Sequence, residues 1–190
     1  MTASFSGAVL CGGASRRMGR DKATLLVDGE PMALRVVHAL RQAGAHPVVA
    51  IGGDPAELGG LGLEVVPDAE PGAGPFPATL TALRHAAAET VVVLSCDLLA
   101  PSPAAITTLV ERLEACGPEV AAAVPVVDGV HQWTHAAWRR SAVEDLAAAR
   151  RSGVGSLRGA ARNLTICAVR DLVASDVADA DDPLDLPGAR

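Results

Sequence analysis

The sequence has few aromatic residues. Its 190 residues include no tyrosine, two phenylalanines and two tryptophans, whereas alanine and valine are abundant. Small aliphatic side chains must therefore fill the core, and a chain of this length can bury a substantial one. Because we find neither an internal repeat nor a linker that would divide the chain, we expect residues 1–190 to form a single domain of ordinary size.

Several other features are missing, and each absence excludes a class of protein. No apolar run approaches the roughly 20 residues that cross a bilayer, and the sequence does not start with the basic residues and long apolar segment of a secretion signal. The net charge of −6 argues against a protein that binds nucleic acid through a basic face. The four cysteines are scattered without a Cys-x-x-Cys pair, which favours reduced thiols over disulfides or a zinc site. We expect a cytoplasmic protein that binds neither nucleic acid nor a membrane.

Segments typical of strands alternate with segments typical of helices along the chain. This alternation is characteristic of an α/β fold with a mostly parallel sheet. The expected strands are residues 7–10, 47–51, 63–66, 91–95, 120–127 and 164–169. The expected helices begin near residues 31, 77, 101, 140 and 155 and end near residues 44, 89, 116, 151 and 162. Residues 131–138 alternate weakly between apolar and polar, and we expect them to pair antiparallel with a neighbour.

A loop rich in glycine and basic residues follows the first expected strand. Glycines let its backbone turn sharply and bring successive N–H groups close to an anion, and arginine and lysine bind phosphate oxygens. Neither the Walker A pattern nor the Rossmann Gly-x-Gly-x-x-Gly pattern is present. The loop therefore predicts a polyphosphate-binding site of another kind. Its sequence is Leu10-Cys11-Gly12-Gly13-Ala14-Ser15-Arg16-Arg17-Met18-Gly19-Arg20-Asp21-Lys22.

Two carboxylates, Asp68 and Asp97, follow expected strands at their carboxyl ends. Ligands of open α/β sheets bind beyond the carboxyl ends of the strands, so both residues should lie near the basic loop. Asp97 is placed to hold Mg²⁺ against a polyphosphate; the alternative is that it caps the helix expected near Pro101. Asp68 is equally suited to binding a ribose hydroxyl and to capping its own loop.

These motifs resemble those of a known family. The loop from Leu10 to Lys22 resembles the signature of nucleotidyltransferases that build sugar nucleotides and related conjugates. Its Gly-Gly-x-Ser form with a final Asp-Lys is most similar to the MobA-like molybdenum cofactor guanylyltransferases. Residues 94–97 resemble their Leu-Pro-Cys-Asp motif, residues 71–76 their Gly-Pro-Leu segment, and residues 179–186 their Asn-x-Asn-Thr-Pro-Glu-Asp-Leu ending. The resemblance covers nearly the whole chain.

The resemblance implies a fold and an activity. The fold is a Rossmann-like three-layer sandwich of the nucleotide-diphospho-sugar transferase type, with one antiparallel strand in a mostly parallel sheet. The activity is the transfer of GMP from GTP to the phosphate of molybdopterin, with release of pyrophosphate. Molybdoenzyme apoproteins or their chaperones are further candidate partners.

The resemblance also implies roles for particular residues. Arg16, Lys22 and Asp97 are the implied catalytic residues, with Mg²⁺ on Asp97 and with Asp181 as a candidate second metal ligand. Alternatively, Asp181 belongs to a solvated acidic tail in which Asp182 caps a last short helix. The implied nucleotide contacts are Leu10, Cys11, Gly12, Gly13, Ser15, Arg16, Lys22, Gly52, Asp68 and Asp97.

The chain departs from the family pattern in three places. Gly52 stands near where guanylyltransferases commonly carry an asparagine that contacts the nucleotide. Pro77-Ala78 replaces Ala-Gly, and the proline that follows Asp97 has moved to Pro101. Three further functions therefore stay open: a cytidylyltransferase for the same pterin, a nucleotidyltransferase for a sugar phosphate or phospholactate, and a nucleotide-binding partner protein without turnover.

The segment 131–135 contains aromatic and imidazole side chains that have no assigned role. Trp133 is able to stack on a flat, polar-edged pterin, although a tryptophan in such a segment more often belongs to the core or to an interface. Arg150, Arg151 and Arg158 either receive the phosphate of the acceptor or decorate the surfaces of helices. The sequence leaves both questions open.

Overall fold

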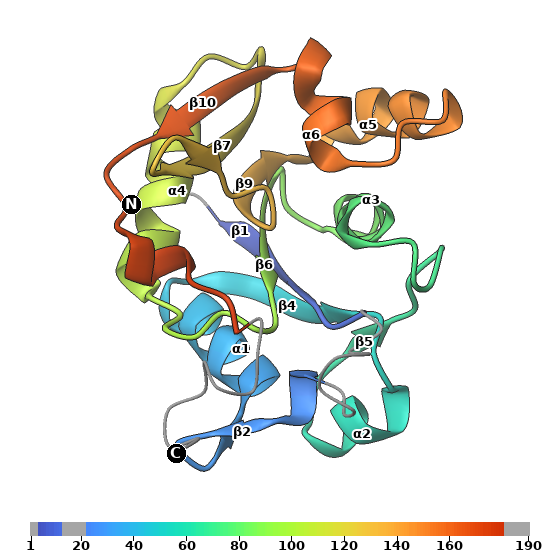
Figure 1. The fold of residues 1–190 in the computed structure, drawn as a ribbon, viewed down its shortest axis with the longest axis vertical. Helices are drawn as coiled ribbons and strands as arrows, with labels where there is room; N and C mark the ends of the chain where they lie inside the picture. Colours follow the sequence, from blue (N-terminus) through green and yellow to red (C-terminus); the bar gives the residue numbers. More distant parts are fainter. Residues whose placement is uncertain (1–3, 13–21, 181–190) are drawn as a thin grey trace.

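One sheet runs through the middle of the protein, with the strand order β10-β7-β9-β6-β1-β4-β5 (Figure 1). The computed structural model describes residues 4–12 and 22–180. A short strand β8 (Val130–His131) pairs with β7, and β2 (Leu26–Val27) pairs with β3 (Glu30–Pro31) in a separate hairpin. The main strands are β1 (Phe5–Leu10), β4 (Ala45–Ile51), β5 (Val65–Val66), β6 (Thr90–Ser95), β7 (Val120–Val127), β9 (His135–Arg139) and β10 (Thr165–Val169).

The sheet is mostly parallel. β1 pairs in parallel with β4 on one side and with β6 on the other, β4 pairs in parallel with β5, and β10 pairs in parallel with β7. β9 lies antiparallel between β6 and β7. The expected mostly parallel sheet with one antiparallel strand is confirmed, and β9 is the segment of residues 131–138 that pairs antiparallel. β8 adds a short antiparallel hairpin at the end of β7.

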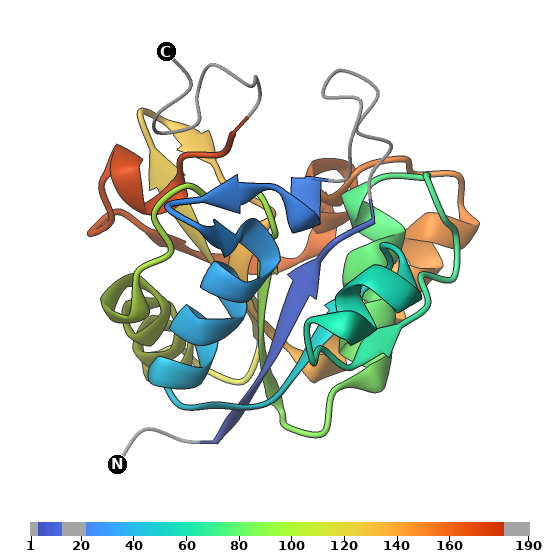
Figure 2. The same cartoon turned by 90° about the horizontal axis from the view of Figure 1, so that it is seen from below.

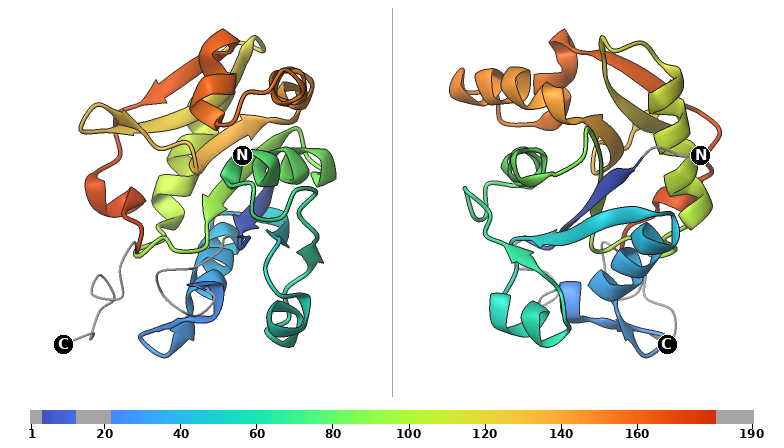
Figure 3. Two further views of the ribbon diagram at one scale, coloured as in Figure 1. Left: turned by 45° about the vertical axis from the view of Figure 1, so that its right-hand side comes forward. Right: turned by 180° about the vertical axis from the view of Figure 1, so that it is seen from behind.

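Helices cover both faces of the sheet and complete the expected three layers. Helices α1 (Met32–Gln42) and α4 (Pro103–Ala115) lie on one face, as Figure 2 shows. Helices α3 (Pro75–His85), α5 (Val143–Arg151) and α6 (Leu157–Ala160) lie on the other, and both views of Figure 3 show the same division. No helix in the described part of the chain is long and apolar enough to cross a bilayer. Short 3-10 helices are η1 (Lys22–Thr24), η2 (Arg140–Ala142), η3 (Ala161–Asn163) and η4 (Ala174–Val177).

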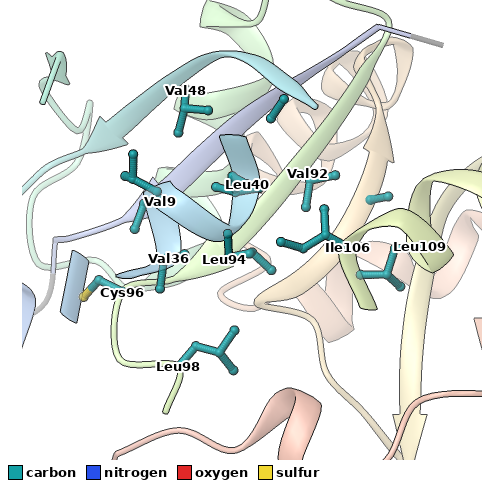
Figure 4. Packing of buried hydrophobic residues seen from close by; sticks show 14 of the residues in the cluster. Val9, Val36, Leu40, Val48, Val92, Leu94, Cys96, Leu98, Ile106 and Leu109 are labelled. Carbon is teal, nitrogen blue, oxygen red and sulfur yellow. The ribbon is translucent and has the colours of Figure 1, made fainter. Parts of the chain in front are cut away.

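Successive residues of each central strand enter different layers of the core, because side chains alternate across a strand. In β1, Val9 joins the layer under α1 and α4, whereas Ala8 and Leu10 join the layer under α3, α5 and α6. Figure 4 shows the first layer, in which Leu40 of α1 and Ile106 of α4 lie near the strand residues. The expected aliphatic core is thus present, and its few aromatic members, such as Trp138 and Phe76, are fully buried.

A short helix, α2 (Pro55–Gly60), lies where the sequence predicted only a loop. Asp54 caps it, because its side chain accepts hydrogen bonds from the backbone N–H groups of Ala56 at 2.7 Å and Glu57 at 3.1 Å. Asp followed by Pro is the usual start of a helix, so the signal was present and was missed. The helix has six residues, too few for an apolar period to stand out.

Arg139 at the end of β9 ties α4 to β7. Its guanidinium donates hydrogen bonds to the carbonyls of Val120 at 3.0 Å, Leu113 at 2.9 Å, Cys116 at 3.1 Å and Gly117 at 3.4 Å. The last carbonyls of a helix have no partner within the helix, and a cation near them also opposes the helix dipole. One side chain therefore closes the end of α4 and the connection into β7.

We expect Arg139→Met to lower the free energy of unfolding by about 2–3 kcal/mol, because several carbonyls lose a charged donor. Arg140→Met is the matched control. The neighbouring Arg140 forms only an exposed ion pair with Glu89, and its replacement should change stability by less than about 1 kcal/mol. Urea unfolding of the two variants measures both values, and equal effects would contradict the role of Arg139.

Candidate functional site

The candidate site lies at the carboxyl ends of β1, β4, β5 and β6, which share one edge of the sheet because these strands are parallel. From β1 the chain proceeds outward to β4 and β5, and α3 then returns it to β6 on the other side of β1. Such a reversal of strand order is the place where open α/β sheets bind ligands. Leu10 at the end of β1 pairs directly with Ser95 at the end of β6.

Lys22 and Asp97 meet at this edge. Lys22 Nζ lies 2.8 Å from Asp97 Oδ2, and the two side chains are only 19% and 15% exposed. The same Nζ donates a hydrogen bond to the backbone carbonyl of Ala180 at 2.5 Å. The residue that ends the basic loop is therefore placed beside the carboxylate that ends β6, as a partly desolvated ion pair. An anionic ligand entering here meets a lysine that is already held in place.

Asp97 does not cap the helix that follows it. Ser102 is the N-cap of α4, and its hydroxyl accepts a hydrogen bond from the N–H of Ala105 at 3.2 Å. The second oxygen of Asp97 accepts a hydrogen bond from the hydroxyl of Ser95. One oxygen of Asp97 is thus held by Ser95 and the other by Lys22. These two contacts fix the orientation of the carboxylate at the site. Ser95 was not among the residues expected from the sequence.

A pocket of about 480 Å³ opens at the same edge of the sheet, between the ends of β1, β4 and β5. Cys11 and Gly12 form one wall, Gly52 and Gly53 form the next, and Asp68 stands with the loop that follows β5. This volume lies within the range of small-molecule sites. The pocket therefore collects Cys11, Gly12, Gly52 and Asp68, which the sequence resemblance implied as nucleotide contacts.

Gly12 and Gly52 cross in close contact at the floor of this pocket. A Cβ on residue 52 would lie 3.0 Å from Gly12 Cα, and Gly52 has a positive φ of 70°. Most side chains rarely adopt that conformation, and any side chain at this position would be crowded against the backbone of Gly12. The close approach of the two loops is therefore a structural reason for a glycine at position 52.

Asp68 caps its own loop and also lines the pocket, and its binding of a ribose hydroxyl stays a prediction. Its Oδ1 accepts a hydrogen bond from the backbone N–H of Glu70 at 3.1 Å. A Cβ built on Gly12 would lie 3.6 Å from the other oxygen, Oδ2. One oxygen therefore holds the loop, while the other lies on the pocket side.

The loop that carries Asp68 is fastened to α5. Arg150 Nη2 lies 2.5 Å from Glu70 Oε2, and Arg150 Nε donates to Glu70 Oε1 at 3.2 Å. This hydrogen bond, aided by the charge of Arg150, holds the pKa of Glu70 below its ordinary value. The ion pair is accordingly present at neutral pH and is lost as the pH falls through that lowered pKa. Arg150 is thus occupied by the protein, which weighs against its binding the phosphate of an acceptor.

A second hollow lies at the β7–β8 hairpin, with a volume of about 290 Å³. Gly129, Val130, His131, Trp133 and Arg158 line it. The rings of His131 and Trp133 are stacked, with centroids 5.2 Å apart and planes inclined by 11°. The structure therefore joins Trp133 to Arg158, as an aromatic face beside a cation. Such a hollow suits a flat ring that carries negative charge.

His135 does not belong to this hollow, although it is close to Trp133 in sequence. It is buried, and its Nε2 lies 2.9 Å from Asp179 Oδ1. Sequence reasoning missed this pair and missed the carbonyl of Ala180 as a partner of Lys22. The signal for the first was an imidazole within an otherwise apolar strand; a backbone carbonyl leaves no signal in a sequence.

Not every expected site residue has a side chain at the site. One has its side chain in the core, and four others lie outside the described residues. The Leu10 side chain is buried in the core, and its carbonyl accepts a hydrogen bond from the N–H of Cys96. Leu10 thus contributes by positioning the residues that follow it. Gly13, Ser15, Arg16 and Asp181 lie outside the described residues. Within the part of the chain that the structure describes, no group of three or more His, Cys, Asp or Glu side chains could hold a metal ion.

Comparison with known proteins identifies relatives across most of the chain. The model of the MobA-like NTP transferase domain matches residues 7–166. The molybdenum cofactor guanylyltransferase of Burkholderia vietnamiensis is 38% identical over 172 residues, covering 83% of this chain and 82% of that protein. The probable molybdenum cofactor guanylyltransferase of Opitutus terrae is 45% identical over 97 residues, and this match spans about half of each chain, 50% and 48%.

Solved structures give the same fold. The molybdopterin-guanine dinucleotide biosynthesis protein A from Archaeoglobus fulgidus superposes with a TM-score of 0.78 over 97% of this chain and 96% of that chain, at 22% identity. That likeness shows the fold, and the sequence matches show the relationship. The resemblance inferred from the motifs is therefore confirmed: this chain belongs to the family of MobA-like NTP transferase domains, together with molybdenum cofactor guanylyltransferases.

Proposed function

We propose that this protein transfers GMP from GTP to the phosphate of molybdopterin and releases pyrophosphate. The observation that carries the proposal is the contact of Lys22 with Asp97 at 2.8 Å, at the sheet edge that also holds a pocket large enough for a nucleoside. Family membership supports the same reaction, and relatives of this chain are named guanylyltransferases.

The nucleotide would lie across the switch point of the sheet. Its nucleoside would occupy the pocket between Gly12, Gly52 and Asp68, and Asp68 is able to accept a hydrogen bond from a ribose hydroxyl. Its phosphates would then extend toward Lys22, whose Nζ is already held at the site by Asp97 and by the Ala180 carbonyl. Lys22 exchanges part of this contact for phosphate oxygens when the nucleotide binds.

The donors at Asp97 fit Mg²⁺. This ion binds through one or two carboxylates together with phosphate oxygens and water, and Asp97 is one carboxylate at the edge where the phosphates would lie. An ion that arrives with the nucleotide would take its other ligands from the phosphates and from water. When bound, Mg²⁺ would neutralise charge on the phosphates. Asp181 as a second ligand remains a prediction.

The chemistry requires positioning and charge neutralisation more than proton transfer. An oxygen of the acceptor phosphate forms a bond to the α-phosphorus of GTP, and the bond from that phosphorus to the bridging oxygen of pyrophosphate breaks. The attacking oxygen is already ionised at neutral pH, so no general base is needed. Lys22, together with Arg16 as predicted from the sequence, would stabilise the charge on the leaving pyrophosphate.

The hollow at the β7–β8 hairpin is the candidate site for the acceptor. Trp133 and His131 offer a stacked aromatic face for a flat ring, and Arg158 offers a positive charge beside it. A pterin is flat and carries polar edges, and molybdopterin also carries a phosphate. The acceptor would thus use the aromatic hollow while its phosphate reaches the carboxyl edge of the sheet. Molybdoenzyme apoproteins or their chaperones, as recipients of the product, remain a prediction.

Transfer of CMP from CTP to the same acceptor is the second candidate. The glycine at position 52 leaves this alternative open, because residue 52 has no side chain that could select guanine. The mechanism would be unchanged, since only the base differs. Transfer to a sugar phosphate or phospholactate, and nucleotide binding without turnover, have no such observation in their favour.

We expect the protein to bind GTP in the presence of Mg²⁺ more tightly than CTP or ATP. Lys22→Met should weaken binding of GTP by about tenfold or more, because a charged contact to phosphate is lost. Arg41→Met, at an exposed position at the end of α1, is the control that removes one positive charge elsewhere. Isothermal titration calorimetry measures all of these affinities. A preference for CTP would select the second candidate, and no binding of any triphosphate would exclude both.

We expect Asp97→Asn to slow pyrophosphate release about 100-fold or more while GTP still binds, because a neutral amide is a poor partner for Mg²⁺ and loses the charge that holds Lys22. Asp171→Asn removes a carboxylate that pairs with Arg112 on the surface, and it should leave the rate unchanged. A coupled pyrophosphate assay with molybdopterin gives the rates, and EDTA should stop the wild-type reaction. An Asp97→Asn variant as fast as the wild type would refute the role of this carboxylate.

A further inference from the structure

The segment of residues 178–180 lies alongside the loop that follows β6. The N–H of Leu99 donates to the Ala178 carbonyl at 2.8 Å, and the N–H of Ala180 donates to the Asp97 carbonyl at 2.9 Å. Leu98 and Asp179 form the antiparallel bridge between them. The carbonyl of Ala180 then accepts the hydrogen bond from Lys22 Nζ. This segment therefore anchors the Lys22 ammonium, although Ala180 is 158 residues away from Lys22 in sequence.

His135 holds this segment from the inside of the molecule. It is 1% exposed and lies opposite Leu94 in the pairing of β9 with β6. Its Nε2–H donates to Asp179 Oδ1 over 2.9 Å, and the Asp179 side chain is 30% exposed. The buried imidazole is thus the link between the middle of the sheet and the segment that carries the Ala180 carbonyl.

An imidazole is an unfavourable choice here if packing is all that is required. Its second nitrogen, Nδ1, is buried without a hydrogen-bond partner in the described residues, and a polar atom in that state destabilises the folded protein. The hollow that His135 lines is bounded mostly by apolar side chains such as Leu94, Leu98 and Pro125, with Ser102 and Asp176 as its other polar members. A leucine would therefore find apolar neighbours at this position. Residues that break local rules of packing in this way are found mainly at functional sites.

We propose that His135 is a positioning residue for the transferase reaction, acting through Asp179. By fixing Asp179 it fixes the backbone of Ala180, and the Ala180 carbonyl keeps the Lys22 ammonium beside Asp97, ready for the phosphates of the nucleotide. His135 itself touches no reacting atom. The inference rests on the proposed function, because it assigns His135 a task in orienting the lysine that this function requires.

The test compares variants at both ends of the link. His135→Gln keeps an N–H donor at similar reach, His135→Leu removes it, and Asp179→Ala removes the acceptor. We expect His135→Leu and Asp179→Ala each to lower kcat/KM for GTP about tenfold, and the double variant to lose no more than either alone, because the two residues act as one unit. His135→Gln should stay within about threefold of the wild type.

A second readout separates positioning from folding. In the Lys22→Met background, His135→Leu should cause no further loss of affinity for GTP with Mg²⁺, because the group that it positions is already gone. His85→Leu is the control for removal of an imidazole near a carboxylate, since His85 lies 3.8 Å from Glu64 at an exposed site at the end of α3. Thermal unfolding of every variant shows whether it is folded.

The outcomes are distinguishable. A folded His135→Leu variant with wild-type kcat/KM would overturn the positioning role, and so would losses that add in the double variant. Neither result would contradict the proposed function, as long as the wild-type protein is active. If His135→Leu fails to fold, Asp179→Ala carries the test, because Asp179 is partly exposed, and wild-type kcat/KM in that variant would equally overturn it. A wild-type protein that neither binds a triphosphate nor releases pyrophosphate would exclude the proposed function, and the role of His135 with it.

Discussion

The parallel pairing of β1 with β4 on one side and with β6 on the other is the constraint on which the rest of the structure depends. Every residue of β1 is buried, so its position between two neighbours is fixed by packing on both faces. Parallel neighbours bring their carboxyl ends to one edge, where Lys22, Asp97 and the pocket lie. If β1 shifted by one residue, its alternating side chains would enter the wrong layers of the core. The end of β1 would also move relative to the ends of β4 and β6, where the site lies.

The site is organised by opposite charges that are held in place before any ligand arrives. Lys22 and Asp97 are partly buried, so their attraction is screened less than that of a surface pair, and removing either partner takes an opposite charge away from the other. The pair also has a chemical consequence, because the carboxylate suits a divalent cation and the ammonium suits phosphate. A nucleotide with its metal ion can satisfy both groups at once, which makes the ion pair a template for the ligand.

The antiparallel strand β9 links the end of α4 to the segment that holds Lys22. It lies between β6 and β7, and each of its ends carries a polar side chain that reaches another element. Arg139 closes the end of α4, and His135 holds the segment before residue 181. Stability and the proposed chemistry thus share one strand. A change in the packing of β9 would alter the contacts at the end of α4 and those around Lys22 together, although these places are far apart in sequence.

Local patterns were enough to locate the main strands, the basic loop and Asp97 at the end of β6, because apolar runs, glycines and charges act on their own neighbours in the chain. They misplaced α3, expected over residues 77–89 and observed over Pro75–His85. They also missed α2, because a helix of six residues has almost no period to read. The partners of the key side chains depended on the tertiary structure. Lys22 and Asp97 are 75 residues apart, His135 and Asp179 are 44 apart, and Arg150 and Glu70 are 80 apart. Strand order and the path of the chain between strands decide which distant groups meet. Neither can be predicted from local periodicity.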